Sequence, residues 1–341
     1  MQLADYDYNL PDSVIAIHPP VTRGDAKLLH LDRKSGQVQD GMYRDLADQL
    51  QTGDVLVINN TRVIPARLLA KTEDGAEREL LLLEKHGQES DHHSSLVMYR
   101  RKLHAGQVLH IDDVAIKIDE VYQNGTAQIS SDTDLWALAE QKGEVPLPPY
   151  MHRREEQGDR ERYQTEFARE KGSVAAPTAS LNLTNQLLEK IRSKGVTVVE
   201  LTLHVGLGTF MPIRVDDLTK HKMHQEYFEI PDQTAAAIKQ AKEQGRRVIA
   251  VGTTVTRTLE FAAEKILAGE TQIRGEADIF IYPGYEFKII DGLLTNFHAP
   301  HSTVLMMTAA FAGWNLLKPA YEHAVTSGYM LLSYGDSMLI I

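Results

Sequence analysis

Histidines and carboxylates recur beside apolar segments in the second half of the chain, and both residue types can transfer protons near neutral pH. The candidates for acid–base chemistry are His204, His224, Glu226, His298 and Asp336. In HKMHQE, imidazole and carboxylate groups would also suit zinc, but their spacing differs from the i, i+4 histidine pair of helical zinc sites. We therefore expect acid–base work or ordinary structural hydrogen bonding from these side chains, and no metal.

Two segments place small residues directly after an apolar run, where backbone N–H groups can reach an anionic ligand. In VIAVGTTVTRTLE (248–260), Thr253 and Thr254 would open a helix, and Arg257 lies one turn inside it. In HVGLGTF (204–210), two glycines could let the backbone approach a ligand. Neither segment completes a nucleotide-binding fingerprint, so helix capping and a tight turn are the alternative explanations.

The elements that must position these residues follow two patterns. From residue 63 to 148, short β-rich runs alternate with Gly, Asp and Asn turns, which is typical of a small barrel or sandwich. After residue 180, helix and strand patterns alternate, which predicts a mixed, largely parallel sheet with packed helices. We expect an α/β domain over 1–62 and 149–341, with a small β-barrel domain inserted over 63–148.

Caps and turns predict several elements one by one. KLLHLDRKSGQVQ predicts a hairpin, and Thr184 predicts the N-cap of a helix. VTRTLEFAAEKILAG predicts one continuous helix, ADIFIY (277–282) predicts a strand, and an apolar helix should begin at Ser302 or Thr303. The stretch 145–172 begins with prolines and then carries equal numbers of basic and acidic residues, which favours a solvated helix with internal ion pairs.

Composition narrows the class of protein. The chain has 341 residues, a formal net charge of −11 and no cysteine. Disulfide scaffolds, thiolate zinc sites and cysteine nucleophiles are therefore excluded. A nucleic-acid partner would have to meet a local basic patch, because the whole chain is acidic. We also expect a cytoplasmic protein, since no apolar run reaches the roughly 20 residues of a membrane span and the first residues lack the pattern of a signal peptide.

Long ordered strings run through nearly the whole chain. They are GDVLVINNTRVIPARL, GEVPLPPYMHR, DRERYQTEFAREKGSVAAPTA, LTLHVGLGTFMPIRVDDL, HKMHQE, VIAVGTTVTRTLE, IFIYPGYEFKIIDGLLTNFHAPHST and SYGDSML. Together they resemble the S-adenosylmethionine:tRNA ribosyltransferase-isomerase family of queuosine biosynthesis. The resemblance implies two domains with a β-barrel insertion, a monomer, and no recycled cofactor, because S-adenosylmethionine is consumed as a substrate.

The resemblance also implies a reaction. The ribosyl part of S-adenosylmethionine is transferred to 7-aminomethyl-7-deazaguanine at the tRNA wobble position and isomerised to give epoxyqueuosine, with release of adenine and methionine. A base must remove a proton from the ribose 5′ carbon, an acid must assist adenine departure, and the amine must be deprotonated. His298 and Glu226 are the first choices for these proton transfers, beside the other acid–base candidates.

Further residues are expected to bind the two substrates. The candidates for S-adenosylmethionine and the modified base are Gly206, Gly208, Thr209, Arg214, Thr253, Thr254, Arg257, Asn182 and Asn296. The candidates for the tRNA backbone are Arg100, Arg101, Lys102, Arg153 and Arg154. Scattered surface charge is the alternative explanation for the second set.

One position departs from the family pattern. Asn182 follows GSVAAPTAS where the family usually has a histidine, and asparagine cannot shuttle a proton. Two alternatives to the full reaction follow. The chain could be a divergent paralogue that acts on another acceptor, or an inactive protein that binds tRNA or an adenosyl ligand.

Overall fold

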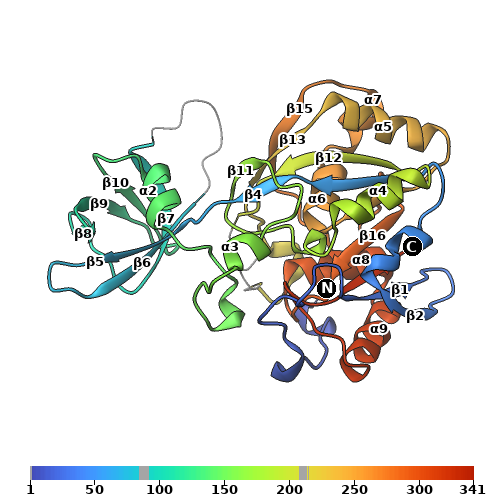
Figure 1. Ribbon diagram of the computed structural model, residues 1–341, viewed down its shortest axis with the longest axis horizontal. Coiled ribbons are helices and arrows are strands. Elements are labelled where there is room, and N and C mark those ends of the chain that lie inside the picture. The colour runs from blue at the N-terminus through green and yellow to red at the C-terminus, as the bar shows by residue number, and fades with distance from the viewer. Residues whose placement is uncertain (1, 84–91, 207–212, 214) are drawn as a thin grey trace. The chain divides into compact units, whose positions relative to one another are not determined.

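The computed structural model describes residues 2–83, 92–206, 213 and 215–341. The chain forms two compact units (Figure 1). The first unit comprises Met1–Thr61, Gln164–Glu170 and Ala176–Ile341, and the second comprises Arg62–Tyr163 and Lys171–Ala175. The barrel-bearing unit thus extends beyond the predicted range of 63–148, because residues 149–163 and 171–175 belong to it by their contacts.

The first unit is built on a nine-stranded mixed sheet with the order β15-β13-β12-β3-β14-β16-β17-β1-β2. In that order the strands are Ile273–Ala277, Glu226–Ile230, Thr197–Leu203, Val55–Asn59, Val248–Val251, Gly292–Asn296, Ser337–Ile340, Lys27–Leu31 and Val38–Met42. The central strands β12, β3, β14 and β16 run parallel. The predicted fold class is confirmed, and so is the hairpin, which is formed by β1 and β2.

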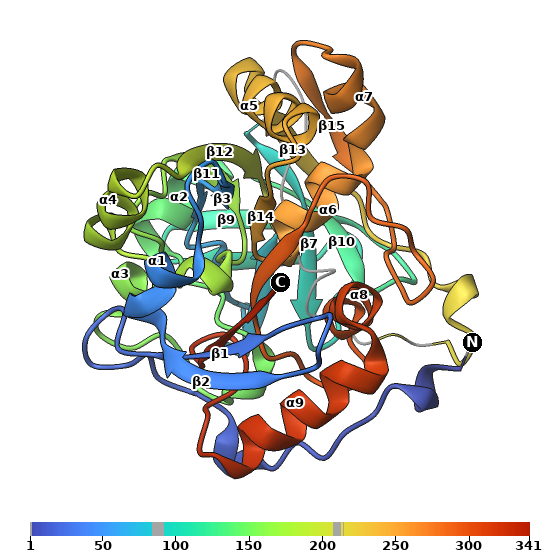
Figure 2. The ribbon, with the colours of Figure 1, turned by 90° about the vertical axis from the view of Figure 1, so that its right-hand side faces the viewer.

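Helices pack on this sheet through apolar faces. They are α1 (Leu46–Gln49), α4 (Asn185–Ser193), α5 (Asp232–Glu243), α6 (Thr253–Phe261), α7 (Ala263–Ala268), α8 (Thr303–Ala312) and α9 (Trp314–Thr326). Leu188 and Ile191 of α4 share a buried core with Leu56 and Ile58 of β3. The hydroxyl of Thr184 accepts the N–H of Leu187, so the predicted N-cap is confirmed. Figure 2 shows α8 and α9 beside β1 and β2.

The start of α8 was also predicted correctly, and three other predictions need correction. Ser302 is the N-cap of α8, because its hydroxyl accepts the N–H of Leu305. The continuous helix predicted over 255–269 is two helices, α6 and α7, divided at Ala262. The strand predicted over 277–282 is wrong. Strand β15 ends at Ala277 opposite Glu226, the first residue of its neighbour β13, so residues further on have no ladder partner.

The charged stretch is mostly irregular. Its regular α-helix is only α3 (Asp159–Arg162), preceded by Gly158 at φ 99°. Arg153 donates to both carboxylate oxygens of the buried Asp159, at 2.5 and 2.9 Å. The predicted ion pairs therefore exist, but they hold loops together, and the predicted solvated helix does not form.

The second unit contains a closed barrel with the strand order β10-β7-β6-β5-β8-β9. In that order the strands are Thr126–Ser130, Ser94–Arg100, Glu77–Leu82, Arg67–Lys71, Val108–Ile111 and Val114–Val121. Helix α2 (Leu135–Lys142) begins at Asp134, which caps it through the N–H groups of Trp136 and Ala137. Short strands β4 (Thr61–Val63) and β11 (Glu170–Ser173) form a separate two-stranded sheet. Within the described ranges of the chain, no helix is long and apolar enough to span a bilayer.

Candidate active site

Strand direction brings the predicted acid–base residues to one edge of the nine-stranded sheet. The carboxyl ends of the parallel strands β12, β3, β14 and β16 share this edge, and β13 and β17 begin there because they run antiparallel to their neighbours. The residues at these ends are His204 after β12, Glu226 at the start of β13, Thr253 and Thr254 after β14, His298 after β16, and Asp336 before β17. Ligands of open α/β sheets bind at such an edge.

Distance along the edge divides these residues into two groups. Neighbouring strands lie about 4.8 Å apart, so the ends of β13 and β16 are separated by roughly 19 Å along the sheet. Proton transfer needs donor and acceptor atoms about 3 Å apart. Glu226 and His298 therefore cannot serve the same substrate atom, although both can line one extended ligand.

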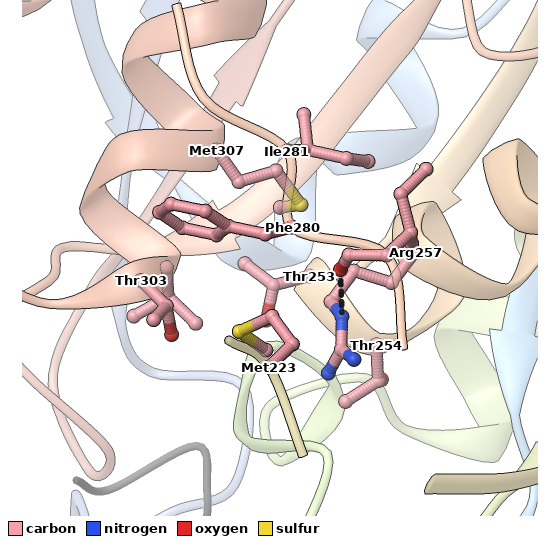
Figure 3. A pocket seen from close by; sticks show the side chains of 10 residues that line it. Met223, Thr253, Thr254, Arg257, Phe280, Ile281, Thr303 and Met307 are labelled. Atoms are coloured by element: carbon pink, nitrogen blue, oxygen red, sulfur yellow. Dashed lines mark hydrogen bonds between the residues drawn. The ribbon is translucent and has the colours of Figure 1, made fainter. Parts of the chain in front are cut away.

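A pocket opens at the β14 side of this edge (Figure 3). It is a shallow, partly open hollow, and the figure of about 310 Å³ for its empty space includes open solvent. Its lining is Met223, Thr253, Thr254, Arg257, Ile279, Phe280, Ile281, Thr303, Val304 and Met307. The first turns of α6 and α8 thus face an apolar wall of methionine, isoleucine and phenylalanine. Three of the predicted binding residues, Thr253, Thr254 and Arg257, lie together here.

Thr253 and Thr254 lie where a strand changes into a helix. Gly252 follows β14 and has φ 94°, a backbone conformation that favours glycine. Gly252 supplies no side-chain cap, so the first N–H groups of α6 are left to other partners. The hydroxyl of Thr254 accepts a hydrogen bond from the Asn59 amide at 3.4 Å. Helix dipole and N–H groups make this a favourable place for a carboxylate or phosphate.

Arg257 has its charge neutralised inside the protein. Its guanidinium forms an ion pair with the carboxylate of Glu226, and their side chains are only 7% and 2% exposed. Arg257 also donates to the carbonyl oxygens of Ala277 and Ile279, at 3.3 and 3.4 Å. Glu226 further accepts the N–H of Gly206 at 3.0 Å. Protonation of Glu226 would leave the guanidinium buried without a counter-charge, which argues against Glu226 as a proton acceptor.

His204 is held by two neighbouring segments. Its Nδ1 lies 2.8 Å from the hydroxyl oxygen of Thr61, and its N–H donates to the carbonyl of Tyr227. The rings of His204 and Tyr227 stack with centroids 5.9 Å apart. The imidazole is half-buried and follows β12, the neighbour of the strand that begins at Glu226.

His298 is fixed by its backbone and by its ring. Tyr8 donates to its carbonyl oxygen at 2.7 Å, and its N–H donates to the Tyr321 hydroxyl at 3.1 Å. The ring Nε2 lies 2.9 Å from the hydroxyl of Thr295. Burial lowers the pKa of His298 to about 3, so the imidazole is neutral at physiological pH.

The side chains of three predicted site residues form hydrogen bonds with other residues of the protein. Asn296 accepts from the Thr178 hydroxyl at 2.8 Å and donates to the Asp336 carbonyl at 3.3 Å. The carboxylate of Asp336 accepts the N–H groups of Lys27 and Met330, while burial raises its pKa. Asn182 is buried and accepts the N–H of Gly24 at 3.3 Å. These hydrogen bonds hold the fold together.

The remaining acid–base candidate, His224, lies outside the pocket lining. His224 is exposed, whereas His221 packs edge-on against Phe280 with ring centroids 4.8 Å apart. Burial and the nearby His224 lower the pKa of His221. In the part of the chain that the structure describes, no three His, Asp or Glu side chains lie close enough together to hold a metal ion.

Comparisons with known proteins decide the family. Residues 3–340 match the family described as "Queuosine biosynthesis protein". Proteins named S-adenosylmethionine:tRNA ribosyltransferase-isomerase from Pelodictyon phaeoclathratiforme and Chlorobium chlorochromatii are 53% and 52% identical to this chain, with 100% of both chains covered. The chain belongs to the queuosine biosynthesis protein family. The crystal structure of S-adenosylmethionine tRNA ribosyltransferase from Thermotoga maritima is also similar, with a TM-score of 0.58 and 33% identity over 99% of this chain and 100% of that one.

The basic residues predicted to bind tRNA differ in their exposure and in their ion pairs. Arg100 and Arg154 are exposed but lie near carboxylates, since Arg100 is 3.8 Å from Glu79 and Arg154 is 2.8 Å from Glu77. Arg101 and Lys102 directly follow Arg100 in the chain and are exposed. Arg153 is only 11% exposed, and Asp159 takes up its guanidinium. Arg153 is thus the least available of the set.

Three predicted binding residues lie outside the described ranges, namely Gly208, Thr209 and Arg214.

Other residues at the sheet edge were not predicted from the sequence. Asn59 and Thr61 are completely buried at the end of β3 and contact Thr254 and His204, respectively. A run of Asn, Asn and Thr directly after a wholly apolar strand was a signal that could have found them. Phe280, Met223 and Met307 gave no such signal.

Proposed function

We propose that this chain transfers and isomerises the ribosyl part of S-adenosylmethionine onto 7-aminomethyl-7-deazaguanine in tRNA, forming epoxyqueuosine and releasing adenine and methionine. The similarity to enzymes named S-adenosylmethionine:tRNA ribosyltransferase-isomerase, which covers both chains completely, carries this proposal. S-adenosylmethionine is a substrate here, so the reaction needs no recycled group. A monomeric state and a cytoplasmic location stay predictions.

The two groups of residues at the sheet edge suggest a division of labour. At the β16 end, we assign His298 the removal of the ribose 5′ proton, because its imidazole is neutral. Its low pKa makes it a weak base, so the acidity of the carbon beside the sulfonium must supply much of the driving force. At the β12 end, His204 lies near the α6 pocket and is assigned to the departing adenine. The ends of β12 and β16 are roughly 14 Å apart along the sheet, so both side chains must reach toward the ribose to act on one bound S-adenosylmethionine.

The pocket suits the methionyl part of the substrate. Its carboxylate would meet the first N–H groups of α6 beside Thr253 and Thr254. Its sulfonium-bearing chain would lie against Met223, Met307 and Phe280, which offer apolar and polarisable surface. Arg257 is already paired with Glu226, so we assign this ion pair to shaping the pocket floor.

Adenine release is the direct test. Purified protein is incubated with S-adenosylmethionine and with tRNA that carries the aminomethyl base, and adenine is quantified by chromatography while the tRNA nucleosides are analysed. Adenine together with epoxyqueuosine supports the proposal. Adenine that appears only with another acceptor would favour the divergent paralogue, and binding without adenine would favour the inactive protein.

Variants test the residue assignments separately. His298→Ala should abolish turnover, whereas the binding of S-adenosylmethionine should persist, because the methionyl pocket is unchanged. His323→Ala serves as the matched control, since this histidine of α9 pairs with Asp40 and lies outside the pocket lining. Near-normal turnover of a well-folded His298→Ala variant would refute the assignment.

A further inference from the structure

We propose that Thr61 is a positioning residue that fixes the ring and the tautomer of His204, with the proton on Nε2. The catalytic consequence depends on the proposed function. The hydrogen bonding itself does not, so the two can be tested separately.

The hydroxyl of Thr61 has two acceptors within reach, at unequal distances. His204 Nδ1 lies 2.8 Å from Oγ1, whereas the carbonyl oxygen of Glu170 lies at 3.5 Å. Hydroxyl hydrogen bonds are commonest near 2.8 Å, and a contact of 3.5 Å is at the limit. We therefore infer that the Thr61 hydroxyl donates its hydrogen bond to Nδ1 of His204 and not to the carbonyl oxygen of Glu170. An imidazole that accepts at Nδ1 and is neutral carries its proton on Nε2.

Asn59 holds the backbone on both sides of this hydrogen bond, at Thr61 and at Leu203 beside His204. Its Oδ1 accepts the N–H groups of Thr61 and Leu203, each at 3.1 Å. Its Nδ2 donates to the carbonyl oxygen of Leu203 at 2.9 Å. One wholly buried amide thus ties the backbone of Thr61 to the residue that directly precedes His204. The second contact of Nδ2, with the Thr254 hydroxyl, links the same unit to the pocket.

Only an amide side chain can make this set of contacts. Aspartate would offer acceptors alone, and leucine would offer neither donor nor acceptor. Because a buried unpaired polar group is costly, each lost partner would favour rearrangement of the strand ends. The arrangement therefore limits the movement of the His204 ring relative to the first turn of α6.

The proton on Nε2 makes neutral His204 a hydrogen-bond donor. In the proposed reaction, a purine nitrogen gains negative charge as the bond to the ribose breaks, and a donor at this position stabilises that charge. A neutral imidazole can fill this role without transferring its proton. Thr61 would then affect the chemical step and leave substrate binding unchanged.

Two variants of similar size separate the hydroxyl from the shape of the side chain. Thr61→Val keeps the β-branched form and removes the hydroxyl, whereas Thr61→Ser keeps the hydroxyl and removes the methyl group. The tautomer is measured by NMR of protein labelled with ¹⁵N-histidine, with His204 assigned by loss of its signals in His204→Gln. Adenine release gives kcat and KM, and thermal melting monitors folding.

We expect the Nε2–H tautomer in the wild type and in Thr61→Ser, and a mixture of tautomers in Thr61→Val. The kcat of Thr61→Val should fall about tenfold, which corresponds to the loss of one hydrogen bond. Its KM for S-adenosylmethionine should stay within twofold of the wild-type value. If Thr61→Val does not fold, Thr61→Ala is used with the same expectation.

Three results would overturn the proposal: an Nδ1–H tautomer in the wild type, an unchanged tautomer in Thr61→Val, or equal loss of kcat in Thr61→Val and Thr61→Ser. If the wild-type protein released no adenine, the proposed function would fail, and the NMR measurement would still decide the role of Thr61.

Discussion

At the scale of single residues, the ion pair between Glu226 and Arg257 should have a large effect on stability. Both side chains are buried, so removal of one leaves the other charge without a partner. Glu226→Gln and Arg257→Met should each lower the free energy of unfolding by about 3–5 kcal/mol. Chemical denaturation of the purified variants measures this loss.

The double variant Glu226→Gln, Arg257→Met completes a double-mutant cycle with those single variants. It removes both charges at once, so it should be clearly more stable than the sum of the single losses implies. Additive losses, or single losses below 1 kcal/mol, would mean that the two charges are solvated in the protein.

His298 gives a prediction about pH. Burial lowers its pKa to about 3, whereas the ordinary value is 6.5. Between these values the unfolded chain binds a proton that the folded chain does not, so His298 makes stability fall as pH decreases from 6.5 toward 3. Above pH 6.5 it has no such effect. An NMR titration should show no protonation of the His298 ring between pH 5 and 8, and a midpoint near 6.5 would contradict the burial.

Residue types alone indicated much of the chemistry. The histidines, Glu226 and the two threonines of α6 were identified because their types suit proton transfer or anion binding, and the sheet brings them to one edge. The sequence could not show that Glu226 and Arg257 cancel each other, because they lie 31 positions apart and meet only through β13 and α6. Nor could it show that Asp336 binds backbone N–H groups.

At the scale of elements, the turn between β14 and α6 decides where the pocket lies. Gly252 has φ 94°, and a β-carbon there would lie 3.6 Å from that of Ala179, which is ordinary contact. The cost of Gly252→Ala should therefore come from backbone strain, about 1–3 kcal/mol. Denaturation measures it, and affinity for S-adenosylmethionine should fall together with stability.

Gly275→Ala is the matched control for this turn. Gly275 lies in β15, lacks a positive φ, and would place its β-carbon 3.6 Å from the Phe228 ring. It therefore shares the packing distance without the strain. Equal losses for the two variants would show that crowding, not φ, sets the requirement at Gly252.

Elements with a cap or a turn signal were predictable, and elements that depend on a partner were not. Thr184 marked the start of α4 because its hydroxyl bonds within its own turn. The apolar alternation in 277–282 looked like a strand, but a strand needs a ladder, and β13 supplies none beyond Ala277. The helix predicted in the charged stretch does not form for a similar reason, since Arg153 bonds from a loop to Asp159, the first residue of the one-turn helix α3.

At the scale of the whole molecule, tRNA binding by an acidic chain should depend on a small exposed basic patch. The variant Arg100→Ala, Arg101→Ala should weaken tRNA binding and reduce the slope of log affinity against log salt by about 1–2. Titrations at several salt concentrations measure this slope. An unchanged slope would place the tRNA elsewhere.

Arg153→Ala separates binding from folding in the same experiment. Its guanidinium is occupied by the buried Asp159, so its loss should destabilise the protein and leave the salt slope unchanged. A reduced slope would show that Arg153 contacts phosphate directly.

The pairing of β1 with β17 has a consequence for biosynthesis. Leu28–Leu31 pair with Ser337–Ile340, and β17 is the strand that joins the β1–β2 hairpin to β16. The hairpin, although translated early, therefore has no neighbour in the sheet until the ribosome has synthesised the last strand. Such non-local pairing slows folding. A nascent chain arrested before residue 337 should leave this hairpin undocked and open to proteases.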